Sequence, residues 1–121
     1  MQYLLLIYHS EADWAKRAAA EQEPIYGEYR QLREQLSEKG KYLGGSQLKP
    51  TGMATTVRVR DGKRVVTDGP FAETKEQLGG YFLIEASDLD EAIAVAGRIP
   101  AAREGSIEIR PLVVREAART A

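Results

Sequence analysis

Two side chains of this chain are suited to proton transfer, and they lie far apart in the sequence. Asp68 ends a predicted strand and enters the Gly69-Pro70 turn, where a carboxylate could act as a general base or orient a substrate. His9 is the only histidine, and no other side chain here normally titrates near neutral pH. Both have structural interpretations, since Asp often caps a turn and a histidine often lies in a surface loop. Asp68 and His9 are the catalytic candidates, with the structural role left open.

The segment 68–81 holds most of the residues placed to contact a ligand. It combines three glycines, one proline, four charged and two aromatic residues in fourteen positions, without a helical or strand pattern. A loop of this length inside a compact domain is usually functional. The alternatives are a solvated charged rim and aromatic rings that pack in the core. The ligand-binding candidates are Tyr8, Phe71, Lys75 and Tyr81.

The composition argues against several classes of protein. The 121 residues suit a single domain, 1–121, and 17 basic against 18 acidic residues leave no excess for nucleic acid. No apolar run approaches the roughly 18 residues of a membrane span, and the N-terminus lacks the basic region of a signal peptide. The absence of cysteine and the single histidine argue against disulfides, thiolate chemistry and a zinc site. We expect a cytoplasmic protein with no metal and no cofactor.

The apolar pattern predicts six strands that position these residues. Residues 2–8 and 80–86 are apolar on both alternating faces, which is typical of strands buried on both sides. Asp61-Gly62 is the strongest short signal for a two-residue hairpin turn. Pro111 suggests an edge position for the last strand. The predicted strands are residues 2–8, 41–48, 55–60, 63–67, 80–86 and 106–114.

Three segments predict helices. Residues 10–20 form a short helical segment with Ser10 as its cap. Pro24 is expected in the first turn of the main helix, which ends before Gly40. The main helix carries one apolar stripe, formed by Ile25, Tyr29, Leu32 and Leu36. Tyr8, Tyr26, Tyr29 and Tyr81 could line the space between this helix and the sheet, with core packing as the alternative and the favoured one for Tyr29.

The third helix follows residues 80–86. Asp88 and Glu91 predict a capping box at its start, and the Ile99-Pro100 step or Gly97 ends it. The side chains expected to be buried are Leu89, Ala92, Ile93 and Ala96.

The order of these elements predicts an α+β fold. Without the hairpin at residues 55–67 it is βαββαβ, the ferredoxin-like plan, in which both helices cover one face of the sheet. Strands 2–8 and 80–86 are nevertheless apolar on both faces, so the second face needs a cover. A second copy of the same sheet is the simplest cover, which predicts a homodimer.

The run Asp68-Gly69-Pro70-Phe71, followed by AETKEQLGGY, resembles the signature of the DGPF group of YCII-related proteins. Residues 3–8, 55–58, 88–92 and 107–111 fit the same family. The resemblance implies a dimeric α/β barrel with the ferredoxin-like plan. It also implies a reactive His–Asp pair, in which Asp68 matches by motif. Many DGPF sequences have a histidine near the position of Arg103, so the arginine departs from that pattern.

Three functional hypotheses follow. The first is a small-molecule-binding homodimer with an apolar cleft near Asp68, either a binder or a cofactor-independent enzyme; related dimeric barrels act on small organic acids or lactones. The second is a non-catalytic regulatory or interaction module, because DGPF proteins are commonly encoded beside extracytoplasmic-function sigma factors. The third is a structural dimer without a ligand. A polar pocket around Asp68 would favour the first, and a large exposed apolar patch would favour the second.

Overall fold

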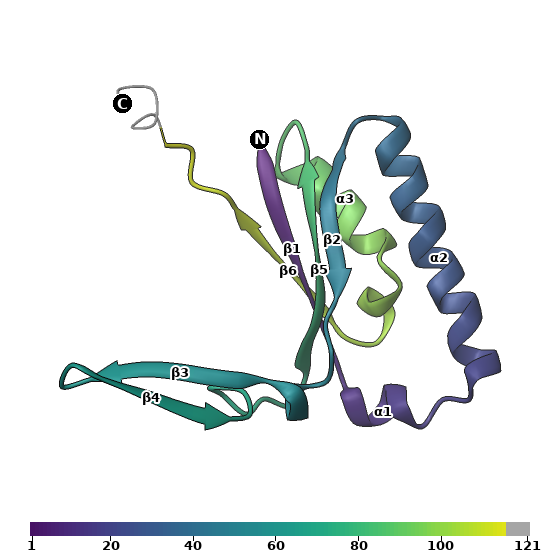
Figure 1. The fold of residues 1–121 in the computed structure, drawn as a ribbon. Coiled ribbons are helices and arrows are strands. Elements are labelled where there is room, and N and C mark those ends of the chain that lie inside the picture. Colours follow the sequence, from purple (N-terminus) through teal and green to yellow (C-terminus); the bar gives the residue numbers. More distant parts are fainter. Residues whose placement is uncertain (116–121) are drawn as a thin grey trace.

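The computed structural model describes residues 1–115 and contains one four-stranded sheet, one separate hairpin and helices on one side (Figure 1). The strands and helices are β1 (Gln2–His9), α1 (Glu11–Ala15), α2 (Ala19–Glu38), β2 (Tyr42–Gln47), β3 (Thr55–Arg60), β4 (Lys63–Asp68), β5 (Gln77–Glu85), α3 (Leu89–Arg98) and β6 (Ser106–Pro111), with two 3-10 turns, η1 (Thr51–Met53) and η2 (Pro100–Arg103).

The sheet has the strand order β2-β5-β1-β6, and every neighbouring pair is antiparallel. With the β3–β4 hairpin set aside, this order and the βαββαβ succession are those of the ferredoxin-like fold. Helices α2 and α3 lie on the same face of the sheet (Figure 1). The predicted fold class is therefore confirmed, including the edge position of β6.

The core lies between that face and the two helices. Leu5, Ile84 and Ile99 are fully enclosed, and Leu32 and Leu36 of α2 are buried with them. The stripe predicted for the main helix is confirmed in its second half, whereas its first half is only partly buried.

The buried face of α3 differs from the prediction. Leu89 and Ile93 are half exposed, at 50% and 52%. The side chains that face the sheet are spaced at i, i+3, i+4 and i+7 and are Ala92, Val95, Ala96 and Ile99. This stripe presents two alanines, whose small side chains let the helix approach the sheet closely. Ala92 and Ala96 are buried as predicted, whereas Val95 and Ile99 are buried in place of Leu89 and Ile93.

The start of α2 also differs from the prediction. The helix begins at Ala19, so Pro24 lies inside it and not in its first turn. Its start is capped by the Glu21 carboxylate, which accepts the Ala18 N–H at 3.1 Å. Proline has no backbone N–H, so the helix loses one hydrogen bond at this position. Pro24 lies close to the N-terminal end of α2, where few intrahelical hydrogen bonds precede it. The segment expected to be helical over 10–20 contains the short helix α1, capped by Ser10 as predicted, and the first two residues of α2.

The C-terminal end of α2 is as predicted. Gly40 has a positive φ of 69°, a backbone conformation that favours glycine. Its N–H donates to the Ser37 carbonyl at 3.0 Å, and the Lys41 N–H donates to the Leu36 carbonyl at 2.8 Å. These two bonds form a Schellman motif, which turns the chain sharply into β2.

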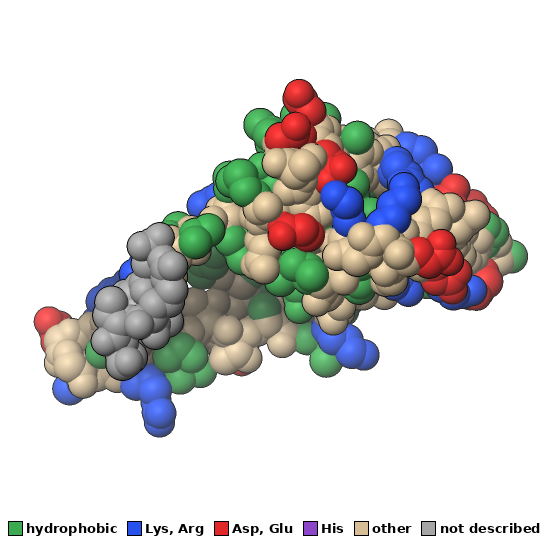
Figure 2. Space-filling model, turned by 90° about the horizontal axis from the view of Figure 1, so that it is seen from above, with side chains coloured by type: hydrophobic (Ala, Val, Ile, Leu, Met, Phe, Trp, Pro, Cys, Tyr) green, Lys and Arg blue, Asp and Glu red, His purple; other side chains and the backbone are tan. Residues whose placement is uncertain are grey.

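The hairpin projects away from the rest of the molecule (Figure 1). Asp61 and Gly62 both have positive φ, 53° and 73°, which confirms the predicted turn of type I′. One face of the hairpin carries Val57, Val59 and Val66, each more than half exposed. Seen from above, the molecule is hollowed between the hairpin and the helix-covered body (Figure 2).

The face of the sheet away from the helices is uncovered within residues 1–115. It carries the second apolar set of the central strands, Leu4 and Leu6 on β1 and Tyr81 and Leu83 on β5, all half buried. The expectation that both faces of these strands are apolar is confirmed. No helix among the described residues is long and apolar enough to cross a membrane.

Candidate functional site

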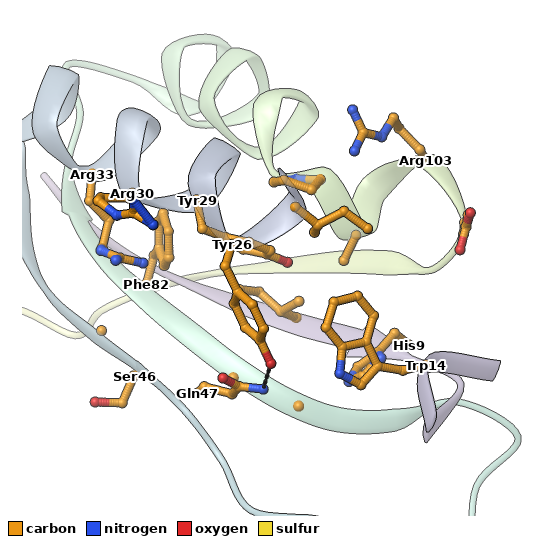
Figure 3. Close-up of a pocket in the computed structure, with 18 of the residues that line it drawn as sticks. His9, Trp14, Tyr26, Tyr29, Arg30, Arg33, Ser46, Gln47, Phe82 and Arg103 are labelled. Atoms are coloured by element: carbon orange, nitrogen blue, oxygen red, sulfur yellow. Dashed lines mark hydrogen bonds between the residues drawn. The ribbon is translucent and has the colours of Figure 1, made fainter. Parts of the chain in front are cut away.

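A cleft of about 550 Å³ lies between the first half of α2 and the helix-covered face of the sheet. Strands β1, β2 and β5 form its floor, α2 forms one wall, and α1 and η2 lie at the end that holds His9 (Figure 3). Apolar and aromatic side chains share the lining with polar and charged groups, and such a combination is common in ligand pockets.

The cleft exists because the two surfaces that border it do not fill the space between them. Gly45, Gly79 and Gly80 line the sheet side, where they contribute no side chain. Tyr26 and Tyr29 stand on α2 opposite them and hold the helix away from the sheet. The predicted position between helix and sheet is confirmed for Tyr26 and Tyr29 and is wrong for Tyr8 and Tyr81, which lie on the opposite face of the sheet.

His9 occupies one end of the cleft. Its ring fills the space over Gly79, where a Cβ atom would clash with the imidazole Nε2. Trp14 meets it edge to face at a centroid distance of 6.3 Å, and Tyr26 meets Trp14 in the same way at 5.5 Å. Arg17 lies 5.6 Å from the Trp14 ring centroid. The imidazole is therefore held between a glycine and an indole.

The short helix α1 that carries Trp14 is clamped in place. The Glu11 carboxylate accepts from the N–H and the hydroxyl of Thr51, at 2.9 and 3.0 Å. The Gln22 side chain donates to the Trp14 carbonyl at 3.1 Å, which ties α1 to α2. These bonds hold α1, and with it Trp14, at the end of the cleft where His9 lies.

Four arginines and two carboxylates line the cleft. Arg17 pairs with Glu104, and Arg103 binds Glu28 through two bonds of 3.1 and 2.6 Å. The hydrogen bond from Arg103 lowers the pKa of Glu28, although both groups are exposed and the pair is screened by water. Within residues 1–115, neither Arg30 nor Arg33 forms an ion pair.

Two tyrosines along the cleft have altered acidity. Burial raises the pKa of Tyr29, and a backbone hydrogen bond at Ala101 partly opposes this rise. Burial also raises the pKa of Tyr42, and the charge of Arg33 opposes it. Both phenols therefore stay protonated at neutral pH and can donate to a ligand.

Of the six predicted site residues, His9 alone is part of this cleft. Asp68 is exposed at the end of β4, Phe71 is 79% exposed, and Lys75 is exposed in the loop 69–76. Tyr8 and Tyr81 lie on the opposite face of the sheet, where the Tyr8 hydroxyl donates to Glu108 at 3.2 Å.

The loop that carries Phe71 and Lys75 is shorter than predicted. Strand β5 begins at Gln77 and not at Gly80, since Gln77 and Leu78 pair with His9 and Tyr8 of β1. Gly79 belongs to the strand because its lack of a side chain leaves room for His9. The predicted capping box of α3 is also half formed: Asp88 accepts the Glu91 N–H, whereas the Glu91 carboxylate bonds to the Ser87 N–H and to Lys41.

Sequence reasoning missed most of the cleft residues. The sequence pattern places Trp14 in a short helix without indicating its contacts, and it does not single out Arg30 or Arg33. One signal could have found the arginines: together with Tyr26 and Tyr29 they follow the i, i+3, i+4, i+7 spacing of one helix face. No three His, Asp or Glu side chains among the described residues are grouped closely enough to hold a metal ion.

Comparison with known proteins gives the family of this chain. The family model of the YCII-related domain matches residues 1–115. An uncharacterised protein of Rhizobium meliloti (strain 1021) is 38% identical over 116 residues, which cover 94% of each chain. The match spans every element described above, including β1, α2 and β5, which form the cleft. The chain belongs to the YCII-related family.

Proposed function

We propose that this protein binds a small organic molecule in the cleft between α2 and the sheet. The observation that carries the proposal is the cavity itself, about 550 Å³ with aromatic walls and His9 at one end. This volume lies within the roughly 300–1,000 Å³ of sites for small ligands. Its shape depends on glycines in the sheet and on a clamped α1, both built into the fold.

His9 is the group that we propose for acid–base chemistry, should the bound molecule be a substrate. The imidazole borders the cleft, and its ring position is fixed by Gly79 and Trp14. A positioned histidine can give or take a proton near neutral pH without a cofactor. The role of Asp68 as a base stays a prediction. Its carboxylate is exposed on β4 and lies outside the cleft.

Trp14 provides a direct test, because it is the only tryptophan of the chain and it lines the cleft. A ligand in the cleft should change Trp14 emission and raise the melting temperature by mass action. The measurement is a screen of small organic acids, alcohols and amines with both readouts. In Trp14→Phe the emission change should disappear, whereas a ligand of the cleft should still raise the melting temperature of the protein, by a smaller amount. A library in which no compound moves either readout at millimolar concentration contradicts the proposal.

We further propose that the protein is a homodimer whose subunits cover the free faces of each other's sheets. The support is the apolar set Leu4, Leu6, Tyr81 and Leu83 on that face. A stable contact buries at least about 1,200 Å² in total. Light scattering should give twice the 13.4 kDa of the chain. Leu83→Lys places a charge on the proposed interface and should lower that mass. Ile93→Lys, on the outside of α3, is the control and should leave the mass unchanged. A wild-type mass equal to that of one chain contradicts the dimer.

A second candidate function is a regulatory module that binds an extracytoplasmic-function sigma factor. The observation in its favour is the row of exposed valines on the projecting hairpin, Val57, Val59 and Val66. The test is gel filtration of the purified protein mixed with such a sigma factor from the same organism. A complex that Val57→Ser with Val66→Ser abolishes would favour this function, and separate elution would count against it.

A further inference from the structure

The charges that line the cleft are unevenly distributed. The acidic lining residues are Asp13, on the short helix beside Trp14, and Glu104, which is already paired with Arg17. Arg103 is likewise occupied by Glu28. Arg30 and Arg33 remain, and no acidic residue of the described chain forms an ion pair with either. One end of the cleft therefore carries two positive charges that no carboxylate of residues 1–115 neutralises.

Helix geometry brings these two guanidinium groups to one place. Tyr26, Tyr29, Arg30 and Arg33 all line the cleft and follow the spacing of one helix face. Figure 3 shows Arg30 and Arg33 together beside the ring of Phe82, at the end of the cleft away from His9 and Trp14. Arg33 and Tyr42 both line the cleft and both border one shallow surface depression, and the positive charge of Arg33 opposes the rise that burial causes in the Tyr42 pKa.

Two carboxylates lie outside this end of the cleft and could compete for the arginines. Glu34 and Glu38 border a shallow surface depression that Arg30 and Arg33 also border. Both glutamates are exposed, and neither comes within ion-pair distance of an arginine in the described residues. Solvent therefore surrounds the two carboxylates, while the arginines border both the depression and the cleft.

The middle of the cleft is apolar. Ile7 and Phe82 form its floor, and Tyr29 packs edge to face with Phe82 at a centroid distance of 6.2 Å. A ligand that reaches from the arginines to His9 must cross these side chains, so its body must be apolar or aromatic. A charged end and an apolar body together define the ligand class.

We propose that the cleft binds a small carboxylic acid with an apolar body, its carboxylate held by Arg30 and Arg33 and its body lying over Phe82 towards His9. This inference rests on the proposed function and specifies the ligand of the same cleft. The guanidinium fork matches a carboxylate through two parallel N–H···O bonds, and the Tyr42 hydroxyl is available as a further donor. The carboxylate would then be fixed far from His9, and the opposite end of the molecule would lie against the imidazole.

Three probes with one carbon skeleton test the charge requirement on the wild-type protein. They are 3-phenylpropionate, 3-phenylpropan-1-ol and 3-phenylpropylamine, titrated at constant ionic strength with Trp14 emission as the readout. We expect the carboxylate to bind at least about tenfold more tightly than the alcohol, because hydrogen bonds to charged groups contribute more than neutral ones. The amine should bind most weakly. Equal binding of acid and alcohol, or tighter binding of the amine, overturns the carboxylate assignment and leaves the cleft as a binding site.

Variants of Arg30 and Arg33 test whether these two residues bind the carboxylate of the probe. Arg30→Gln with Arg33→Gln should remove the preference for 3-phenylpropionate over the alcohol and leave the affinity for the alcohol unchanged. Arg58→Gln with Arg60→Gln on the hairpin is the matched control, since it removes two positive charges far from the cleft. A preference that survives in the double variant overturns the assignment to these arginines. No emission response to any of the three probes at millimolar concentration contradicts both this inference and the proposed cleft.

Discussion

The two ends of the helix-covered sheet face are built differently. At one end Ala92 and Ala96 of α3 are buried in the same core cluster as Leu5 and Ile84 of the sheet. At the other end the first half of α2 presents tyrosines over a sheet surface that carries glycines, and a cavity of about 550 Å³ remains. Small side chains on the helix give a closed core, whereas small residues in the sheet opposite large helical ones give a cleft.

This difference separates stability from binding within one domain. The closed end contains the side chains with no exposure, among them Ile84 and Ile99. The open end contains the histidine, the tryptophan and the pair Arg30 and Arg33. Substitutions at the closed end should therefore change the free energy of unfolding, and substitutions at the open end should mainly change binding and emission.

The largest expected effect is at the closed end. Ile84→Ala should lower the free energy of unfolding by about 2–5 kcal/mol, because it leaves a cavity where nothing can collapse to fill it. Tyr26→Ala at the open end should lower it by less, since the phenol is only half buried and borders an existing cavity. Urea denaturation of both variants checks the contrast. Equal losses would mean that the two ends do not differ as described.

Two glycines near His9 give a sharper contrast. A Cβ at Gly105 would clash with the Tyr8 carbonyl, a backbone atom, so Gly105→Ala should lower the free energy of unfolding by about 1–3 kcal/mol. A Cβ at Gly79 would clash with the His9 ring, which can rotate away. Gly79→Ala should therefore cost less than about 1 kcal/mol and shift Trp14 emission, because the ring must move from its place against the indole. An unchanged Trp14 spectrum in Gly79→Ala would count against this arrangement.

An ion pair at the closed end predicts a dependence on pH. Lys41 bonds to Glu91 at 2.6 Å, and this bond, followed by that from the Ser87 N–H, lowers the pKa of Glu91. A carboxyl whose pKa is lower in the folded state adds stability above its unfolded pKa and loses it as pH falls through the folded value. Glu91→Gln should therefore lower the melting temperature at pH 7 and match the wild type at low pH. Glu23→Gln, on the exposed side of α2, is the control and should show no such pH dependence.

The smallest expected effect concerns Asp68. Its carboxylate is exposed and outside the cleft, so Asp68→Asn should change the free energy of unfolding by no more than about 0.5 kcal/mol. Because Asp68 lies outside the cleft, the affinity of Asp68→Asn for 3-phenylpropionate should equal that of the wild type. A variant that keeps its melting temperature and loses ligand binding would instead place Asp68 at the site, as the sequence motif suggests.

Much of the fold follows from the sequence because it depends on local chemistry. Asp61 and Gly62 adopt the positive φ values that a two-residue hairpin turn needs, and Gly40 ends α2 for the same reason. Alternation of apolar residues locates β1 and β5 and indicates that both their faces are apolar. Each of these features depends on a few neighbouring residues, so the sequence alone predicts it.

Which residues share a site was decided only by the tertiary structure. His9 and Asp68 are both catalytic candidates by residue type, yet one borders the cleft and the other ends a strand of the projecting hairpin. Tyr8 adjoins His9 in sequence, but alternation along the strand turns its side chain to the opposite face of the sheet. Arg30 and Arg33 share one cleft with Trp14 and His9 only because α1 and α2 pack against the sheet. A sequence specifies which side chains are present and how each segment folds locally, whereas a binding site consists of contacts between distant segments, and these depend on how the elements pack.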